Sequence, residues 1–387
     1  MQPLKNLKAA ALLLAIVALQ CSISAFSQSR IEVLDSIALP QDYILDLNAA
    51  GSGYEGLATI RAEGSLCGGK TAWMELDSKG QVLRCTPLIL KNGKGTSAYQ
   101  YFKVGQDLYT FHPNTSTTLY HWDKDIREVD AIQIQFPDHK NRYHLTMHQP
   151  LQLSSEAGKA RLVCTAERYY KKSKQSDLLG PYDWNGPSMA ILEVSPEGDK
   201  VAARLFGGHP TYYKEGFTSY RHLVRSCIGP QDQVIQGFAM GGPLSVYNPS
   251  GERIDSLPCP SLPIPEGEKH VWMDKIHTVH FFALQDMYSY IHYDAESDCY
   301  LAHKSYRADK SVADSILAAN DYLGLSKLTA QRRTELEVIK RQGHQTIANV
   351  QYPFPSPKLM RSQGNEIWVQ SGLKIYHCRI VIEREKI

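Results

Sequence analysis

The sequence predicts an all-β fold of the β-propeller class, and three observations point to it. Segments of alternating apolar and polar residues, or of gathered aromatic and β-branched residues, recur along nearly the whole chain. Turn-forming stretches of Gly, Pro, Asn, Asp and Ser separate them at short intervals, which predicts antiparallel hairpins. These hairpins can be grouped four strands at a time, as in the blades of a propeller.

Six hairpins define the predicted units. Their turns lie at residues 77–80, 114–116, 195–199, 248–251, 294–298 and 370–372. Each hairpin belongs to a four-stranded unit, and the units lie near residues 43–90, 98–136, 145–206, 221–257, 277–351 and 357–385. We therefore expect six blades of four antiparallel strands, and a seventh blade is compatible with the same boundaries.

The segment at 30–39 precedes the first unit and also has strand character. We expect it to pair with a C-terminal strand at 379–384, as the outer strand of the last blade. This pairing would close the ring and cover a strand edge that would otherwise be open to other chains.

Two stretches interrupt the repeat. Residues 307–344 are rich in helix formers, with apolar residues three and four apart at 311–319 and 328–341, which predicts a short helical insertion. Residues 167–188 form a long loop that is rich in Tyr, Lys, Gly and Pro. Long loops between regular strands are frequently functional.

The N-terminus has the pattern of a secretory signal peptide. Lysines precede an uncharged run at 9–19, and Ala25 and Ser27 provide small residues for a cleavage site. The run is shorter than the roughly 20 residues that a membrane-spanning helix needs. We therefore expect a signal peptide at 1–27 and a single propeller domain at 28–387.

Lipidation of Cys21 is the alternative, because the leader of a bacterial lipoprotein ends at a cysteine. Gln20 precedes it, where lipoproteins normally have Gly, Ala or Ser, and this argues against a lipid anchor. No later segment is both long and uncharged enough to span a membrane, so we expect no transmembrane span in the mature chain.

Charge and composition exclude several functions. The 387 residues hold 42 Lys and Arg against 40 Asp and Glu, so net charge attracts neither nucleic acid nor an anionic membrane. We therefore expect no nucleic acid partner. The 22 Tyr, beside 10 Phe and 5 Trp, together with 27 Gly and 20 Pro, favour short strands joined by many turns.

Seven of the eight cysteines lie after residue 27, singly and without a Cys-x-x-Cys pair. Cys67 and Cys85 are the nearest pair that could form a disulfide bond in an exported chain. We expect most of the others to be small buried residues in strands, and their spacing gives no zinc site.

Three histidine groupings suggest a metal site, and none of them, His209 included, forms the His-Glu-x-x-His pattern. His144 and His148 would lie about 13 Å apart on one strand, at roughly 3.3 Å per residue. His277 and His280, in a strand, would point to opposite faces. The sequence therefore predicts no metal ion and no other cofactor.

The sequence identifies no catalytic residues. It has no Gly-x-Ser-x-Gly nucleophile motif, and no Gly-rich loop leads from a strand into a helix to bind phosphate. Asp294 and Asp298 form a carboxylate pair, but they lie in a predicted turn, where Asp is favoured for local hydrogen bonds to the backbone.

Aromatic side chains in two loops are the candidates for ligand binding. One set lies among lysines in the 167–188 loop, and the other follows a predicted strand in the segment 207–214. Such rings stack on sugars or anchor protein partners, and the alternative is that they only pack the loops against the ring. The candidates are Tyr169, Tyr170, Tyr182, Trp184, His209, Tyr212 and Tyr213.

Several stretches together carry a resemblance to a known family. They are Tyr290-Ile291-His292-Tyr293-Asp294 with Tyr300, residues 190–205 leading into Gly208-His209-Pro210 and Tyr213, and the turn at 247–252. In these stretches the chain resembles exported, propeller-like proteins of Bacteroides-type bacteria, which are domains of unknown function and often lipoproteins. The resemblance implies a six-bladed propeller in the cell envelope, and it supplies no catalytic residues.

The sequence therefore favours an exported binding or scaffold protein over an enzyme. The ligand would be a glycan, a peptide or an envelope protein, held by the propeller loops or in the central funnel. The location would be the periplasm or the cell surface. The alternative is an envelope hydrolase or lyase that acts on carbohydrate or peptide in the funnel, where residues far apart in sequence can meet without forming a linear motif.

Overall fold

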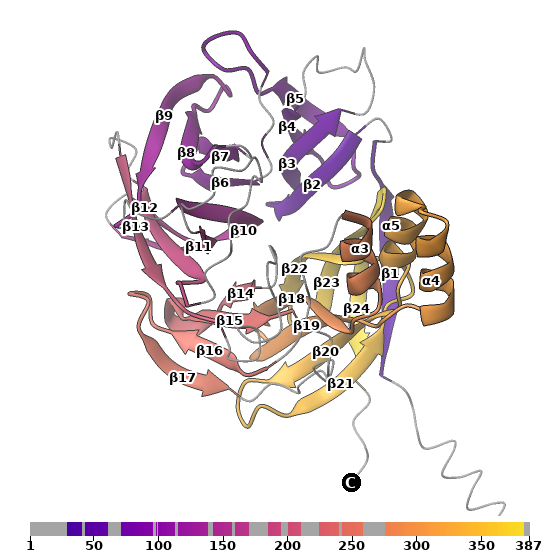
Figure 1. The fold of residues 1–387 in the computed structure, drawn as a ribbon. Coiled ribbons are helices and arrows are strands. Elements are labelled where there is room, and N and C mark those ends of the chain that lie inside the picture. Colours follow the sequence, from indigo (N-terminus) through magenta and orange to yellow (C-terminus); the bar gives the residue numbers. More distant parts are fainter. Residues whose placement is uncertain are drawn as a thin grey trace, which may run out of the picture.

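The computed structural model forms a ring of β-sheets, with helices α3 to α5 gathered at one side of the ring (Figure 1). The structure describes residues 29–40, 43–60, 71–95, 98, 100–112, 115–137, 142–156, 159–169, 185–194, 200–209, 224–239, 242–257 and 275–382. The predicted signal peptide and Cys21 lie outside these residues.

The strands of the described residues form six groups of four, which we call units 1 to 6. Unit 1 contains β2 (Tyr43–Ala50), β3 (Gly53–Ile60), β4 (Thr71–Leu76) and β5 (Val82–Pro87). Unit 2 contains β6 (Gln100–Val104), β7 (Asp107–His112), β8 (Thr115–Trp122) and β9 (Glu128–Gln135). Unit 3 contains β10 (Arg142–Glu156), β11 (Lys159–Tyr169), β12 (Met189–Val194) and β13 (Lys200–Phe206).

The other three units continue the same order around the ring. Unit 4 contains β14 (Val224–Ile228), β15 (Val234–Phe238), β16 (Leu244–Tyr247) and β17 (Arg253–Leu257), with a 3-10 turn, η1 (Pro230–Asp232), between its first two strands. Unit 5 contains β18 (Met287–Asp294), β19 (Cys299–Ser305), β20 (Thr334–Lys340) and β21 (Thr346–Gln351). Unit 6 contains β22 (Lys358–Gln363), β23 (Glu366–Ser371), β24 (Lys374–Val381) and β1 (Arg30–Ala38).

The all-β fold class is confirmed. Neighbouring strands within each unit pair antiparallel, and the units lie close to the predicted boundaries. The sheets are arranged around a common centre, as in a propeller (Figure 1). The number of six blades stays a prediction, which the six groups of four strands support.

The two ends of the described chain meet in unit 6. β1 pairs antiparallel with β24, from Arg30 opposite Val381 to Ala38 opposite Lys374. The predicted closure is therefore confirmed, although the partner strand begins earlier than the expected segment 379–384. An outer strand taken from the other end of the chain ties the last unit to the first by backbone hydrogen bonds.

Units 2 and 3 are joined in a way that the sequence did not predict. β13 runs parallel to β9, with Lys200 opposite Gln133 and Ala202 opposite Gln135, so the two units form one eight-stranded sheet. The hairpin pattern reports only which strands are consecutive, so it contains no information about pairing between two outer strands.

The helical insertion is shorter than predicted. Helices α4 (Lys310–Ala318) and α5 (Tyr322–Ala330) lie within the predicted range, and their N-caps are Asp309 and Asp321. The expected helix at 328–341 is wrong beyond α5, because β20 occupies residues 334–340. Nearly every side chain of β20 is buried between neighbouring sheets, and this packing overrides the helix propensity of its Glu, Leu and Lys residues.

The two histidines at the start of the fifth predicted unit lie in a helix and not in the expected strand. Helix α3 (Lys275–Ala283) contains both His277 and His280, so the expectation that they point to opposite faces of a strand is wrong. α3 packs on α4 and α5 through a small apolar cluster around Ala283, Ala313 and Leu325. None of the helices in the described residues has the length and apolar character needed to cross a membrane.

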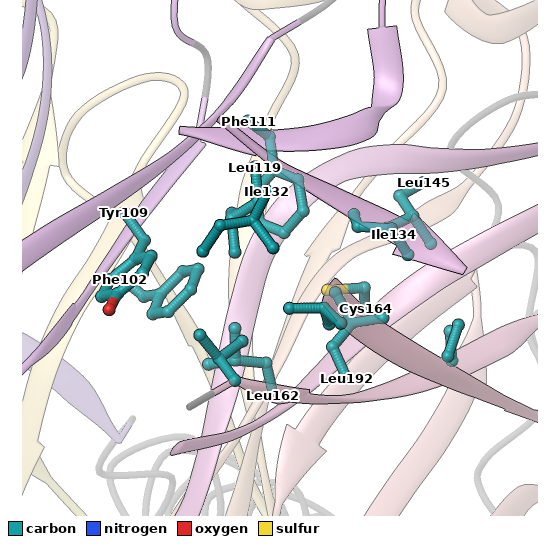
Figure 2. Packing of buried hydrophobic residues seen from close by; sticks show 14 of the residues in the cluster. Phe102, Tyr109, Phe111, Leu119, Ile132, Ile134, Leu145, Leu162, Cys164 and Leu192 are labelled. Carbon is teal, nitrogen blue, oxygen red and sulfur yellow. The ribbon is translucent and has the colours of Figure 1, made fainter. Parts of the chain in front are cut away.

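The core consists of apolar layers between neighbouring units rather than one central core. Figure 2 shows the layer between unit 2, which contributes Phe102 and Leu119, and unit 3, which contributes Leu162 and Leu192. Because side chains of a strand alternate between its two faces, each sheet contributes one face to each neighbouring layer. This explains why five of the six residues of β12 are buried.

Candidate functional site

Most of the predicted aromatic residues lie outside the described part of the chain. This applies to Tyr170, Tyr182, Trp184, Tyr212 and Tyr213. Tyr169 is the last residue of β11, and its side chain is not described. His209 is described; it follows β13 and is 9% exposed.

The strand order brings the two candidate segments to one end of unit 3. β11 and β13 both run antiparallel to β12, so they run in the same direction, and their C-terminal ends lie on the same side of the sheet. Tyr169 ends the first of these strands, and His209 follows the end of the second. Tyr169 and His209, one from each predicted set, therefore lie at the same end of unit 3.

His209 lines a pocket between units 3 and 4, which we call the His209 pocket. Its volume is about 700 Å³, and its lining includes Phe206, Gly208, His209, Phe238, Tyr247 and Arg253. The lining combines ring edges with backbone, imidazole and guanidinium groups, which suits a ligand that is part apolar and part polar.

A chain of buried hydrogen bonds connects two lining residues of the His209 pocket, Tyr247 and Gly208. The Tyr247 hydroxyl donates to Oε1 of Gln236 at 2.9 Å, and Nε2 of Gln236 donates to Oγ of Ser188 at 2.5 Å. Ser188 Oγ in turn donates to the backbone carbonyl of Gly208 at 3.2 Å. The chain links β15 and β16 of unit 4 to the segment before His209, and so fixes one wall against the other.

Gly207 is required where the chain turns into this pocket. Its φ is +75°, and a Cβ atom there would lie 2.7 Å from Oγ of Ser188. Only glycine adopts this conformation without strain, and the added carbon would displace the Ser188 hydroxyl.

Aromatic rings form the side walls. The rings of Phe206 and Tyr247 meet edge to face with centroids 5.1 Å apart, and the ring of His209 lies 6.0 Å from that of Phe238. Burial raises the pKa of Tyr247, although a hydrogen bond with Ser245 and the charge of Arg253 oppose this effect. The phenol is therefore neutral at physiological pH and serves as a hydrogen-bond donor.

Arg253 provides the positive charge of the pocket. It is exposed on β17, directly opposite Tyr247 in the pairing with β16. Among the described residues no carboxylate forms an ion pair with it. An exposed guanidinium beside a phenol and a backbone segment is able to bind a carboxylate or hydroxyl group of a ligand.

A second group of polar residues joins units 5 and 6, and its geometry is not that of a nucleophile. Ser362 Oγ donates to Oδ1 of Asp294 at 2.8 Å, and Nε2 of His292 lies 2.9 Å from the same Oγ. Because the proton of Ser362 is given to Asp294, His292 donates to the hydroxyl and does not act as its base. Burial lowers the pKa of His292, while the charge of Asp294 raises it. The group is a link between β18 and β22.

The other residues considered for metal binding or acid chemistry have local structural partners. His280 is hydrogen-bonded to Asp314 at 2.8 Å. Oδ2 of Asp294 accepts from the backbone and the hydroxyl of Ser297, which is the local turn role expected for it. The described residues contain no group of three or more His, Cys, Asp or Glu side chains arranged to hold a metal ion. His144 and His148 lie on β10, and their side chains are not described.

The described cysteines are of two kinds. Cys85 on β5 is disulfide-bonded. The free thiols are buried in strands, as expected for small apolar residues, and they are Cys164, Cys227, Cys299 and Cys378. Burial raises the pKa of Cys164 to about 12, so this thiol is inert at neutral pH.

The sequence analysis missed the half of the pocket that comes from unit 4. Tyr247 was assigned to a blade, and Arg253 was not considered. Strand alternation places Tyr247 and Arg253 on the face toward unit 3, but nothing in the local pattern shows that this face meets the segment after β13.

Comparison with known proteins identifies a solved structure with a similar fold. No family model and no curated protein matches the chain. The structure is similar to the crystal structure of a member of the DUF4221 family from Bacteroides vulgatus, with a TM-score of 0.61 at 11% identity, over 92% of this chain and 99% of that one.

Two further crystal structures are more distant. A putative exported protein from Bacteroides fragilis has a TM-score of 0.42 at 9% identity, over 90% of this chain and 95% of that one. A virginiamycin B lyase from Staphylococcus aureus has a TM-score of 0.41 at 12% identity, over 91% of this chain and 100% of that one. At these TM-scores neither structure supports a conclusion about the fold or the function. The predicted resemblance to proteins of Bacteroides is confirmed at the level of the fold, which is that of the DUF4221 protein.

Proposed function

We propose that this protein is an exported binding or scaffold module of the cell envelope that holds its ligand in the His209 pocket. The observation that supports this proposal is the pocket itself, which has a volume of about 700 Å³ and is lined by aromatic rings and an exposed arginine. Buried hydrogen bonds connect its Tyr247 and Gly208. Pockets of this size that combine apolar walls with a few fixed polar groups are typical ligand sites.

Two features support export. The sequence has the pattern of a signal peptide at 1–27, and Cys85 is disulfide-bonded. Disulfide bonds persist in oxidising compartments such as the periplasm and the cell surface. We expect the mature protein to begin after Ser27, and the mass of the protein purified from cells tests this. A mass that corresponds to a lipidated Cys21 would instead support a lipid anchor.

The binding function is tested on glycan and peptide arrays with the mature protein. We expect at least one class of ligand to bind, and we expect His209→Ala and His209→Gln to abolish that binding. His277→Ala is the matched control, because His277 is exposed on α3 and does not line the pocket. Absence of binding on both arrays, or binding that both His209 variants retain, would contradict the proposal.

Trp184 tests the part of the predicted site that lies outside the described residues. We expect Trp184→Ala to abolish binding while the melting temperature remains nearly unchanged, because a loop aromatic that contacts ligand contributes little to the core. A large drop in melting temperature would assign Trp184 to packing of the loop.

A further inference from the structure

A second pocket lies on the opposite face of unit 4, toward unit 5. Its volume is about 520 Å³, and it is lined by Val246, Ile254, Asp255, Leu257, Arg341 and His344, among others. We call it the His344 pocket. Unit 4 therefore stands between two pockets, one on each face of its sheet.

The alternation of side chains along β17 explains this arrangement. In the pairing of β16 with β17, Tyr247 is opposite Arg253 and Val246 is opposite Asp255, and a bulge between these pairs accommodates Ile254. Arg253 lines the His209 pocket, whereas Ile254 and Asp255 line the His344 pocket. A single short strand thus contributes to both pockets.

β17 is also an edge strand. It is the last strand of its sheet, pairs with β16 alone among the described residues, and lies at the outer rim of the ring (Figure 1). Its first four residues are exposed, including Ile254 at 51%. Elsewhere in this ring the outer strand of a unit does pair with a further strand: β13 of unit 3 pairs with β9 of unit 2.

We propose that β17 binds an extended peptide by strand addition, and that alternate side chains of the peptide enter the His209 and His344 pockets. This proposal rests on the proposed binding function and names its ligand class. Successive side chains of an added strand point to opposite faces of the sheet, and the two pockets lie on those two faces.

The charges of the two pockets specify which side chains fit. Arg253 has no carboxylate partner among the described residues, so the side toward unit 3 favours an acidic side chain. On the other side Arg341 is neutralised, because its Nε and Nη2 atoms donate to the two oxygens of Asp298 at 2.5 and 3.0 Å.

The remaining lining of the His344 pocket is mixed, with aliphatic side chains beside the polar groups of Gln233, Gln342 and His344, and it favours an uncharged side chain over an acid. Val246, Ile254 and Leu257 form its aliphatic part, and the carboxylate of Asp255 disfavours a second acid. The matching peptide therefore alternates acidic and uncharged residues, and Glu with Val is one such sequence.

The test uses fluorescent octapeptides in which Glu and Val alternate, with Lys in place of Glu as the matched comparison. We expect the Glu peptide to bind the mature protein and the Lys peptide to bind about tenfold or more weakly. Arg253→Glu should reverse this preference. Lys374→Glu, an equal charge change at an exposed position of β24 away from both pockets, should leave it unchanged.

Methylation of the peptide backbone tests strand addition directly. Only alternate N–H groups of an added strand face its neighbour. We therefore expect N-methylation at one set of alternate positions to abolish binding and methylation at the other set to leave it intact. Equal effects of the two sets, an unchanged preference in Arg253→Glu, or no binding of the Glu peptide would each overturn the proposal.

The outcomes separate this inference from the function on which it rests. A glycan that binds and is lost in both His209 variants, while no peptide binds, would support the binding function and reject strand addition. Absence of any ligand on either array would reject both.

Discussion

At the scale of single residues, His303 on β19 shows what burial does to a titratable group. It has no exposed surface, Nε2 lies 3.1 Å from the Tyr352 hydroxyl, and Nδ1 has no hydrogen-bond partner among the described residues. The ring of Tyr290 meets the imidazole edge to face at 5.9 Å. Burial, and to a smaller extent the charge of His292, lowers the pKa of His303 from 6.5 to about 3.

This shift predicts a loss of stability in acid. The unfolded chain binds a proton at His303 near pH 6.5, whereas the folded protein does so only near pH 3. The contribution of His303 to stability is therefore complete above pH 6.5 and declines as the pH falls toward 3, by up to about 1.4 kcal/mol per pH unit. Urea unfolding at pH 7, 6, 5 and 4 measures the slope.

His303→Gln should reduce that slope, because the amide does not titrate and still reaches Tyr352. His277→Gln is the control, since His277 is an exposed histidine on α3. Equal slopes for wild type and His303→Gln would assign the acid sensitivity to other groups.

At the scale of elements, units 2, 5 and 6 share a motif at the start of their second strand. An acid stands two positions before an aromatic residue, and the three motifs are Asp107-Leu108-Tyr109, Asp298-Cys299-Tyr300 and Glu366-Ile367-Trp368. In each unit the acid contacts a basic residue of the third strand or just after it: His121 at 3.0 Å, Arg341 at 2.5 Å and His377 at 2.9 Å. The repeat is visible in the sequence, but its role appears only once the third strand is placed beside the second.

Glu366 tests the contribution of this motif to stability. His377 and Arg379 lower the pKa of Glu366, so the carboxylate stabilises the folded protein above its unfolded pKa of 4.5, and this contribution is lost as the pH falls through the lower folded value. Glu366→Gln should therefore lower the melting temperature at pH 7 and have little effect in strong acid.

Glu252→Gln is the control for this prediction. Glu252 is exposed, and its carboxylate accepts a hydrogen bond from the side-chain amide of Asn248 at 2.9 Å, which carries no charge. A drop in melting temperature as large as that of Glu366→Gln would mean that the motif has no special role.

The elements also show which parts of the fold can be predicted from sequence. Hairpins such as β18 and β19 were predicted because apolar alternation and a turn between them are local features. The strand at β20 was not, because burial by neighbouring units overrides local propensity there. The helix at α3 was not predicted either, and it packs on α4 and α5. For the site, the sequence identified His209 but not Arg253, which reaches the pocket from a different unit.

At the scale of the whole molecule, the ring is closed by a strand from the other end of the chain. Without β1, the edge of β24 would be exposed, and Ile31 would be lost from the apolar cluster shared by units 5 and 6. Such an edge promotes pairing between molecules.

Deletion of residues 29–39 should therefore lower the melting temperature and cause association of the protein, measured by light scattering. A synthetic peptide of residues 29–40 added to the deleted protein should restore both properties. A deleted protein that stays monomeric and melts like wild type would show that the ring does not depend on this strand.

The parallel pairing of β9 with β13 makes one interface between neighbouring units different from the others. Between units 2 and 3, backbone hydrogen bonds join the two outer strands. Between units 3 and 4, the contacts among the described residues are made by side chains of the shared apolar layer and of the His209 pocket. A ligand in the His209 pocket therefore contacts unit 4 on one side and, on the other, a unit whose outer strand is hydrogen-bonded to its other neighbour.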